Sequence, residues 1–178
     1  MRHLDAISNY IQEKRPDVIV NLGDFADLPS LSKYNLAGER EGLRYKKDIC
    51  AAREGMMRLT EFRRFSRNYK PRMELVLGNH EHRIIRTVEE NPHLEGALSM
   101  NDLAYESYGW RVHRFLKVAR IDGIEYSHYF VSGPMGRPLS SAQSMLRERQ
   151  SSCIQGHVQS FQMAVHPKTQ KTAIMAGE

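Results

Sequence analysis

The sequence has no long apolar run and few cysteines. No run approaches the roughly 20 apolar residues of a membrane helix, and residues 1–15 lack the apolar stretch of a signal peptide. We therefore expect a cytoplasmic protein with no membrane partner. Cys50 and Cys153 are its only cysteines, and no metal-binding or disulfide spacing surrounds them. We expect two reduced, buried thiols.

The chain also lacks internal repeats and low-complexity segments. Its 178 residues are one domain's worth, so we expect a single domain over 1–178. The net charge of +5 suits a nucleic-acid or phosphate-bearing partner. Two readings fit the basic cluster before residue 73: the solvated face of a helix, which we favour, or a rim that attracts phosphate. Its members are Arg58, Arg63, Arg64, Arg67, Lys70 and Arg72.

The first half of the chain alternates helix and strand patterns. Apolar residues at helical spacing predict helices, and short apolar runs bounded by Pro or Gly predict buried parallel strands. The expected elements are a helix over 3–15, a strand over 17–22, a long loop over 28–45, a helix over 46–68, a strand over 73–77 and a helix ending near residue 90.

The second half has the pattern of antiparallel strands. The dipeptide Asp122-Gly123 joins two strand-like runs, 115–121 and 124–130, and is a strong hairpin signal. The other expected elements are a short helix over 101–108, a Gly/Pro/Ser-rich loop over 132–141, a short helix over 142–150, a strand-like run at 153–155 and a last hairpin of 161–165 with 171–175. An α/β fold follows from the whole pattern.

Four residues that can bind a metal lie in or just after expected strands. Asp24 follows the first strand, Asn79 the second, His128 lies within the hairpin and His157 follows the run at 153–155. One carboxylate, one amide oxygen and two imidazoles suit manganese, iron or zinc, whereas calcium would want more oxygens.

These residues stand in a series of motifs: Gly23-Asp24-Phe25-Ala26-Asp27, Gly78-Asn79-His80-Glu81, His128 and Gly156-His157-Val158-Gln159. The series resembles the calcineurin-like metallophosphoesterase family. The resemblance implies two mixed β-sheets packed as a sandwich flanked by helices, with two metal ions at the strand ends. The short chain and its Gly-Asn-His-Glu-His-Arg string also resemble phage and prophage members of that family.

The resemblance further implies roles for these residues. Asp24 would bridge both ions, and Asn79, His128 and His157 would complete the second metal site. His80 would face the phosphate and either protonate the leaving oxygen or stabilise the charge on the phosphorus, with Asp27 hydrogen-bonded to it.

Two further residues follow the catalytic histidine closely. Arg83, near the start of the following helix, could reach a phosphate oxygen. His82 would assist at the substrate or simply be solvated. We expect surface or packing roles for the histidines at 3, 93, 113 and 166.

The chain departs from the family pattern twice. No Asp-x-His motif precedes Asp24, and Gln159 stands where the family has a second imidazole for the first metal. Glutamine offers only a weaker, neutral donor. Three explanations fit: a fragment lacking its first strand and its C-terminal end, a protein with one firmly held metal, or a degenerate scaffold. We favour the fragment.

The sequence therefore predicts a metal-dependent phosphoesterase that hydrolyses a phosphate mono- or diester with metal-activated water, and manganese is the expected ion. On charge alone, the substrate is expected to be a nucleic acid or nucleotide. One alternative is a catalytically silent module on the same fold that binds phosphate or nucleic acid. Another is a plain basic nucleic-acid-binding domain with structural histidines.

Overall fold

The computed structural model describes residues 2–33, 41–65 and 68–177, which form two compact units. Unit 1 takes its described residues from Met1–Asn21, Phe25–Leu75 and His80–Val112. Unit 2 takes its described residues from Leu22–Asp24, Val76–Asn79 and His113–Glu178. Two short stretches of the first half thus belong to the compact unit that the second half builds.

Unit 1 contains most of the helices. Its sheet has the order β1-β2-β3. Its α-helices are α1 (Arg2–Lys14), α2 (Tyr45–Leu59), α3 (Phe62–Phe65) and α4 (His82–Glu90), its strands are β1 (Val18–Asn21), β2 (Arg72–Val76) and β3 (Arg111–His113), and its 3-10 helices are η1 (Pro29–Leu31), η2 (Pro92–Leu94), η3 (Met100–Leu103) and η4 (Tyr105–Tyr108).

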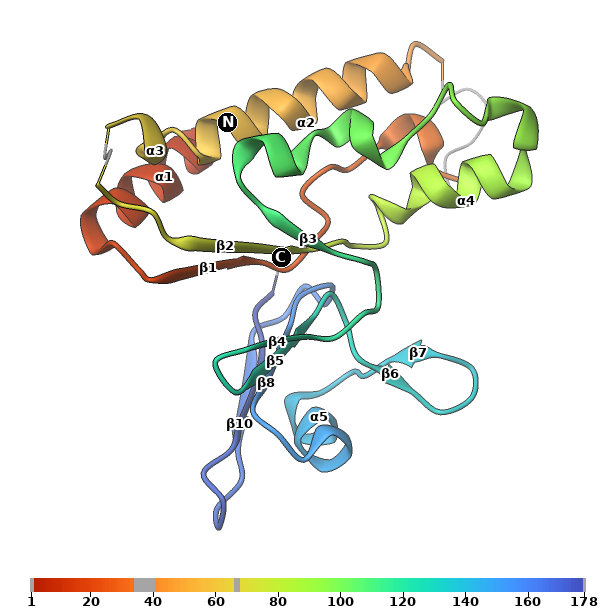
Figure 1. The fold of residues 1–178 in the computed structure, drawn as a ribbon. Helices are drawn as coiled ribbons and strands as arrows, with labels where there is room; N and C mark the ends of the chain where they lie inside the picture. Colours follow the sequence, from red (N-terminus) through yellow and green to blue (C-terminus); the bar gives the residue numbers. More distant parts are fainter. Residues whose placement is uncertain (1, 34–40, 66–67, 178) are drawn as a thin grey trace. The chain divides into compact units, whose positions relative to one another are not determined.

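The first two strands are parallel, as their sequences predict. Val18 lies opposite Arg72, and Asn21 lies opposite Leu75. β2 is buried from its second residue onward, whereas β1 is only half-buried along its length. Figure 1 shows α1, α2 and α3 along one side of these two strands. Because both strands run the same way, the chain leaves β1 and β2 at the same edge of the sheet.

The long helix expected over 46–68 is interrupted, which corrects that prediction. α2 ends at Leu59, where the Thr60 hydroxyl donates to the Met56 carbonyl at 2.8 Å. The Phe62 N–H donates to the Ser8 hydroxyl of α1 at 3.1 Å, and Phe62 is buried. A tertiary hydrogen bond thus replaces a helical one, and the short α3 starts there.

The short helix expected over 101–108 is two 3-10 turns. Ala104 separates them with a φ of 55°, in the left-handed region, which no continuous helix contains. Gly109, with a φ of 93°, ends the second turn as the sequence predicts. Of the loop expected over 28–45, residues 34–40 lie outside the described residues, and the rest includes η1.

Unit 2 is built on a five-stranded sheet of order β4-β5-β8-β10-β9. The three inner strands are parallel to one another, and both edge strands are antiparallel to their neighbours, so the sheet is mixed. Its elements are β4 (Ala119–Ile121), β5 (Ile124–Ser127), β6 (Val131–Ser132), β7 (Arg137–Pro138), α5 (Ala142–Arg149), β8 (Cys153–Gln155), β9 (Gln162–Val165) and β10 (Thr172–Met175). The α/β class is thereby confirmed.

The Asp122-Gly123 hairpin forms as expected. Both residues have positive φ, 50° and 84°, as a tight two-residue turn between right-twisted strands requires. The strands are shorter than predicted: β4 begins only at Ala119, and β5 ends at Ser127, so His128 follows the strand instead of lying within it. The last hairpin also forms, with Thr172 opposite Val165.

Helix α5 covers part of this sheet and closes the core of unit 2. Met145 and Leu146 of the helix lie in one apolar cluster with Cys153, Ala173 and Met175 of the sheet. The segment expected as a plain loop over 132–141 includes a small hairpin of β6 and β7. Figure 1 shows α5 and this hairpin beside the strands of unit 2.

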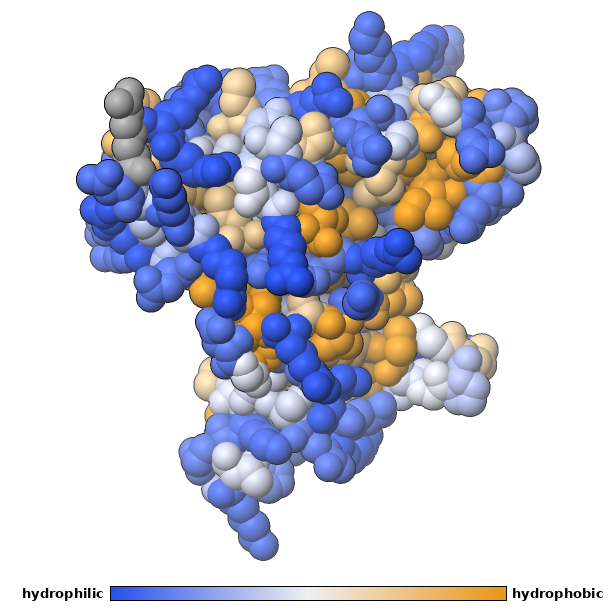
Figure 2. Space-filling view, viewed as in Figure 1, coloured by the Kyte–Doolittle hydropathy of each residue, from blue (hydrophilic) through white to orange (hydrophobic). Residues whose placement is uncertain are grey.

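The surface is polar with scattered apolar patches. The face in Figure 2 is mostly hydrophilic, and apolar residues interrupt it. Within the basic cluster, Arg58 pairs with Glu54 and Asp5, and Arg63 donates to the Tyr108 carbonyl. These contacts indicate that the two arginines stabilise the fold. No helix in the described ranges is long and apolar enough to cross a membrane.

The two cysteines differ in exposure. Cys153 is fully buried, as expected, but Cys50 is exposed on α2, so the prediction of two buried thiols is wrong for Cys50. Helix α2 is amphipathic, and the buried Ile49 lies on its inner face. The next residue, Cys50, lies on the outer face.

Candidate metal centre

Two glycines bring the turns after β1 and β2 into close contact within unit 2. A Cβ on Gly78 would lie 2.0 Å from Asp24 Oδ1 and 2.4 Å from the Asp24 nitrogen. A Cβ on Gly23 would lie 2.6 Å from the Gly78 nitrogen. Only glycine allows the backbones to approach so closely. The approach places Asp24 beside the turn that carries Asn79.

Asp24 sits on this turn in a left-handed conformation, with a φ of 53°. Non-glycine residues rarely adopt it, and such conformations cluster at functional sites. The Asp24 side chain is only 8% exposed, and its Oδ2 lies 3.3 Å from His128 Nε2. The Asn79 Oδ1 lies 2.9 Å from the same nitrogen. His128 itself is fully buried.

The orientation of the His128 ring is fixed by its other nitrogen. Nδ1 lies 2.7 Å from the Leu22 carbonyl oxygen. Because a carbonyl can only accept, Nδ1 carries the hydrogen, and in the neutral ring the Nε2 lone pair faces Asp24 and Asn79. A backbone carbonyl on the distal nitrogen is the usual support of a metal-binding histidine.

His157 is brought to the same place by the turn after β8. The Gly156 N–H donates to the His128 carbonyl at 3.0 Å, which ties the two histidine-bearing segments together. His157 has a φ of 65°, so its backbone too is left-handed. The two imidazole centroids lie 5.0 Å apart.

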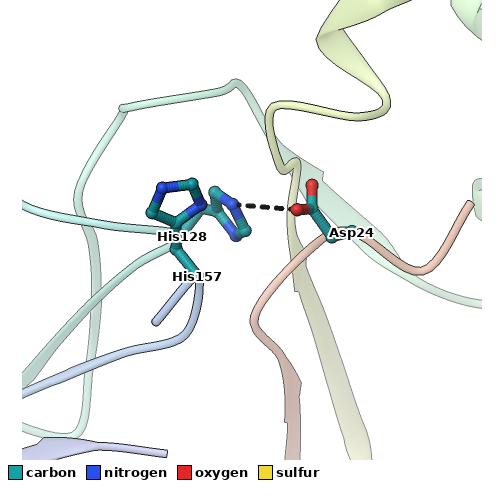
Figure 3. A group of neighbouring side chains, drawn as sticks. All are labelled: Asp24, His128 and His157. Atoms are coloured by element: carbon teal, nitrogen blue, oxygen red, sulfur yellow. Dashed lines mark ion pairs between the residues drawn. The ribbon is translucent and has the colours of Figure 1, made fainter. Parts of the chain in front are cut away.

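The three side chains can each offer one atom to a common centre. Ligand atoms of Asp24, His128 and His157 all lie within 4.8 Å of one another, and Figure 3 shows the three together. Nε2 of neutral His128, Oδ1 of Asn79 and Oδ2 of Asp24 all present lone pairs. Positive charge among them, on a second imidazole proton or a metal ion, would offset their repulsion. This donor set fits manganese, iron or zinc.

Gln159 is the remaining residue that the sequence suggested as a metal ligand. It is exposed, two residues beyond His157.

Two of the expected catalytic residues lie together in unit 1. His80 Nδ1 lies 2.9 Å from Asp27 Oδ1, and the Asp27 side chain is 72% exposed. This contact orients the His80 ring through its Nδ1 nitrogen. His80 directly follows Asn79 in the chain.

Arg83 also contacts Asp27, through both its backbone carbonyl and its carboxylate. Its guanidinium donates to the Asp27 carbonyl at 2.6 Å, lies 3.6 Å from the Asp27 carboxylate and is only 10% exposed. Arg83 thereby fixes the backbone at Asp27. His82, the first residue of α4, is half-buried, and burial lowers its pKa, with Arg86 adding to the effect.

Glu81 also belongs to this site, although its place in the Gly78-Asn79-His80-Glu81 motif predicted no role for it. Its carboxylate is fully buried, and its Oε1 accepts from the Ala26 N–H at 3.0 Å and from the Tyr105 hydroxyl at 3.1 Å. It thereby joins the turn before α4 to the segment that carries Asp27. The signal was its place within the Gly-Asn-His-Glu string, but its partners are distant in sequence.

Tyr129 is another residue of this site, and it packs against the two histidines. Its ring lies 4.7 Å from that of His157 and 5.6 Å from that of His128. Burial raises the pKa of its hydroxyl, and the charge of Asp24 raises it further. The ring packs against both imidazoles, and the raised pKa favours the protonated phenol. Its place directly after His128 was the only sequence signal.

Comparisons with protein-family models, with curated proteins and with solved structures give no match for this chain.

Proposed function

We propose that this chain is a metal-dependent phosphoesterase that hydrolyses phosphate mono- or diesters. The observation that carries the proposal is the convergence of Asp24, Asn79, His128 and His157 in unit 2, on turns held by Gly23 and Gly78. The resemblance of the motifs to the calcineurin-like metallophosphoesterase family supports the proposal. We also propose the fold that this resemblance implies, a sandwich of two mixed sheets. Cytoplasmic location belongs to the same proposal.

Asp24, His128 and His157 would hold the ion, with the Asn79 amide oxygen as a further ligand. A bound divalent cation, expected to be manganese, supplies Lewis-acid chemistry by polarising a phosphoryl oxygen and making water a better nucleophile. The Leu22 carbonyl, through its hydrogen bond with Nδ1, would leave Nε2 of His128 to hold the ion. Tyr129 shields the imidazoles on one side.

His80 would hold the proton for the leaving oxygen. Asp27 lies beside Nδ1 of His80 and orients the imidazole, an arrangement that suits general-acid chemistry. Glu81 and Arg83 act on Asp27 through its backbone segment and are positioning residues. The proposal also includes a direct contact of Arg83 or His82 with the substrate. This part rests on the sequence alone, because both residues closely follow His80.

The substrate class that the charge supports best is a nucleic acid or nucleotide phosphodiester. A net charge of +5 raises the local concentration of polyanions. The test uses generic substrates, so that it does not depend on this choice.

The experiment combines metal content with turnover. The chain is loaded with manganese and dialysed, and metal per chain is measured alongside hydrolysis of bis-p-nitrophenyl phosphate and p-nitrophenyl phosphate. We expect His157→Ala to lose both metal and activity, because it removes one ligand at a half-buried position. His93→Ala, at an exposed histidine outside the centre, is the matched control. Retained activity in His157→Ala would refute the proposal.

One alternative is a binding module that holds a single metal and a phosphate without turnover. The neutral amide of Gln159 in place of a second imidazole favours it, because glutamine is a weaker donor for the first metal. Its signature is about one metal per chain, tight phosphate binding and no hydrolysis. His80→Ala separates the two: it abolishes turnover by an enzyme and leaves a pure binding module unchanged.

A further inference from the structure

A pocket in unit 2 lies between α5 and the turn that joins β9 to β10. Its volume is about 460 Å³, within the range of roughly 300–1,000 Å³ that is common for small-molecule sites. The helix contributes Leu146 and Arg147, and the turn contributes His166 and Lys171. Leu146 is buried, whereas the other three are exposed. The pocket therefore has an apolar floor and a basic rim.

This pocket lies at the opposite end of the sheet from the metal centre. β8 and β10 are parallel, and Lys171 and Gln150 precede them, whereas His157 follows the far end of β8. A three-residue strand spans about 10 Å. A ligand in this pocket would therefore bind at a site separate from the metal ligands.

The charge of the pocket is positive and not neutralised within it. None of the residues that line it is acidic. Arg147 forms no ion pair or hydrogen bond with any residue of the described ranges. Lys171 donates one of its three ammonium hydrogens to the Gln150 carbonyl at 2.5 Å, which fixes its side chain over α5 and leaves two donors.

His166 adds a further donor. Its Nδ1 accepts from the Thr169 N–H at 3.2 Å, so the hydrogen of the neutral ring lies on Nε2. An arginine fork, a lysine and an imidazole N–H together match an anion with several acceptor oxygens. The amides of Gln143 and Gln150, which also line the pocket, can hydrogen-bond an uncharged polar group.

We propose that this pocket binds an organic phosphate of mononucleotide size. The phosphate lies between Arg147 and Lys171, and the organic part lies over Leu146 within reach of the glutamine amides. The volume exceeds what a bare phosphate needs, and the glutamines serve an uncharged polar group. This site does not depend on the proposed phosphoesterase activity.

The test is a titration of the full chain, stripped of metal and dialysed free of chelator, so that a metal centre cannot bind the phosphate. Adenosine monophosphate, adenosine, inorganic phosphate and succinate are added separately, and binding is followed by calorimetry and by amide NMR shifts. We expect saturable binding of adenosine monophosphate, weaker binding of inorganic phosphate and none of adenosine.

Variants assign the binding to this pocket. Arg147→Gln should weaken binding at least about tenfold, the effect of losing one charge-assisted hydrogen bond. Lys168→Gln, in the same turn but outside the lining, is the matched control and should bind as the parent does. His157→Ala should also bind unchanged, which separates this result from the metal centre.

Three results would overturn the proposal. These are no saturable binding of adenosine monophosphate, equal binding by Arg147→Gln, or succinate binding as tightly as adenosine monophosphate.

Discussion

The contact between Gly78 and Asp24 makes a sharp prediction. In Gly78→Ala, the new Cβ would lie 2.0 Å from Asp24 Oδ1, 2.4 Å from the Asp24 nitrogen and 2.8 Å from Cγ. The carboxylate can rotate away, but the backbone nitrogen cannot, so the two turns must separate. Overpacking of this kind typically costs about 1–3 kcal/mol. Rotation of the carboxylate would also take Oδ2 away from His128 Nε2.

Gly78→Ala should therefore lower the free energy of unfolding and also weaken metal binding by about 10–100-fold, the loss usual when a ligand's support is disturbed. Urea unfolding followed by circular dichroism measures the first effect, and a manganese titration measures the second. Gly123→Ala is the matched control: its Cβ meets nothing within 4 Å, so only its φ of 84° costs energy, about 1–2 kcal/mol.

The control should bind metal normally. If Gly78→Ala binds manganese as tightly as the parent and is no less stable than Gly123→Ala, Asp24 is not held as described.

Three further predictions follow from single contacts. His128→Phe leaves the Leu22 carbonyl without its donor and should cost about 1–3 kcal/mol in urea unfolding besides abolishing metal binding; an unchanged metal content would contradict the assigned ligand. Glu81→Leu deprives the Ala26 N–H and the Tyr105 hydroxyl of their acceptor and should lower the melting temperature, whereas Glu81→Gln, which keeps an acceptor oxygen, should lower it much less. Burial raises the pKa of the Cys153 thiol from 9.0 to about 11, so the unfolded chain loses this proton first and the free energy of unfolding should fall between about pH 9 and 11. That fall should be smaller in Cys153→Ala, and an identical pH slope in both proteins would refute it.

The features that could be predicted from the sequence depend on local signals. Asp122-Gly123 specifies its hairpin because both positions tolerate positive φ, and the apolar run before Gly78 specifies β2. The four residues of the candidate metal centre could be named because each follows a strand or a glycine. No single position was enough to mark them; their residue types, their order along the chain and the motif resemblance did so together.

The features that could not be predicted depend on distant partners. α2 ends early because Ser8, far away in sequence, accepts the Phe62 N–H, and no local pattern encodes that contact. Glu81 looked like one more charge on a turn, since its acceptor role depends on Ala26 and Tyr105. The exposure of Cys50 depends on which face of α2 packs, a matter of tertiary context.

The hydrogen bond from His128 to the Leu22 carbonyl links residues 106 positions apart, and the contact to Asn79 spans 49. Because closing such long loops is slow, we expect these contacts to form late in folding. A metal that binds only the completed cluster would pull the folding equilibrium toward the native chain by mass action. The dependence of the refolding rate on manganese would then show whether Leu22 and His128 come together before or after the rate-limiting step.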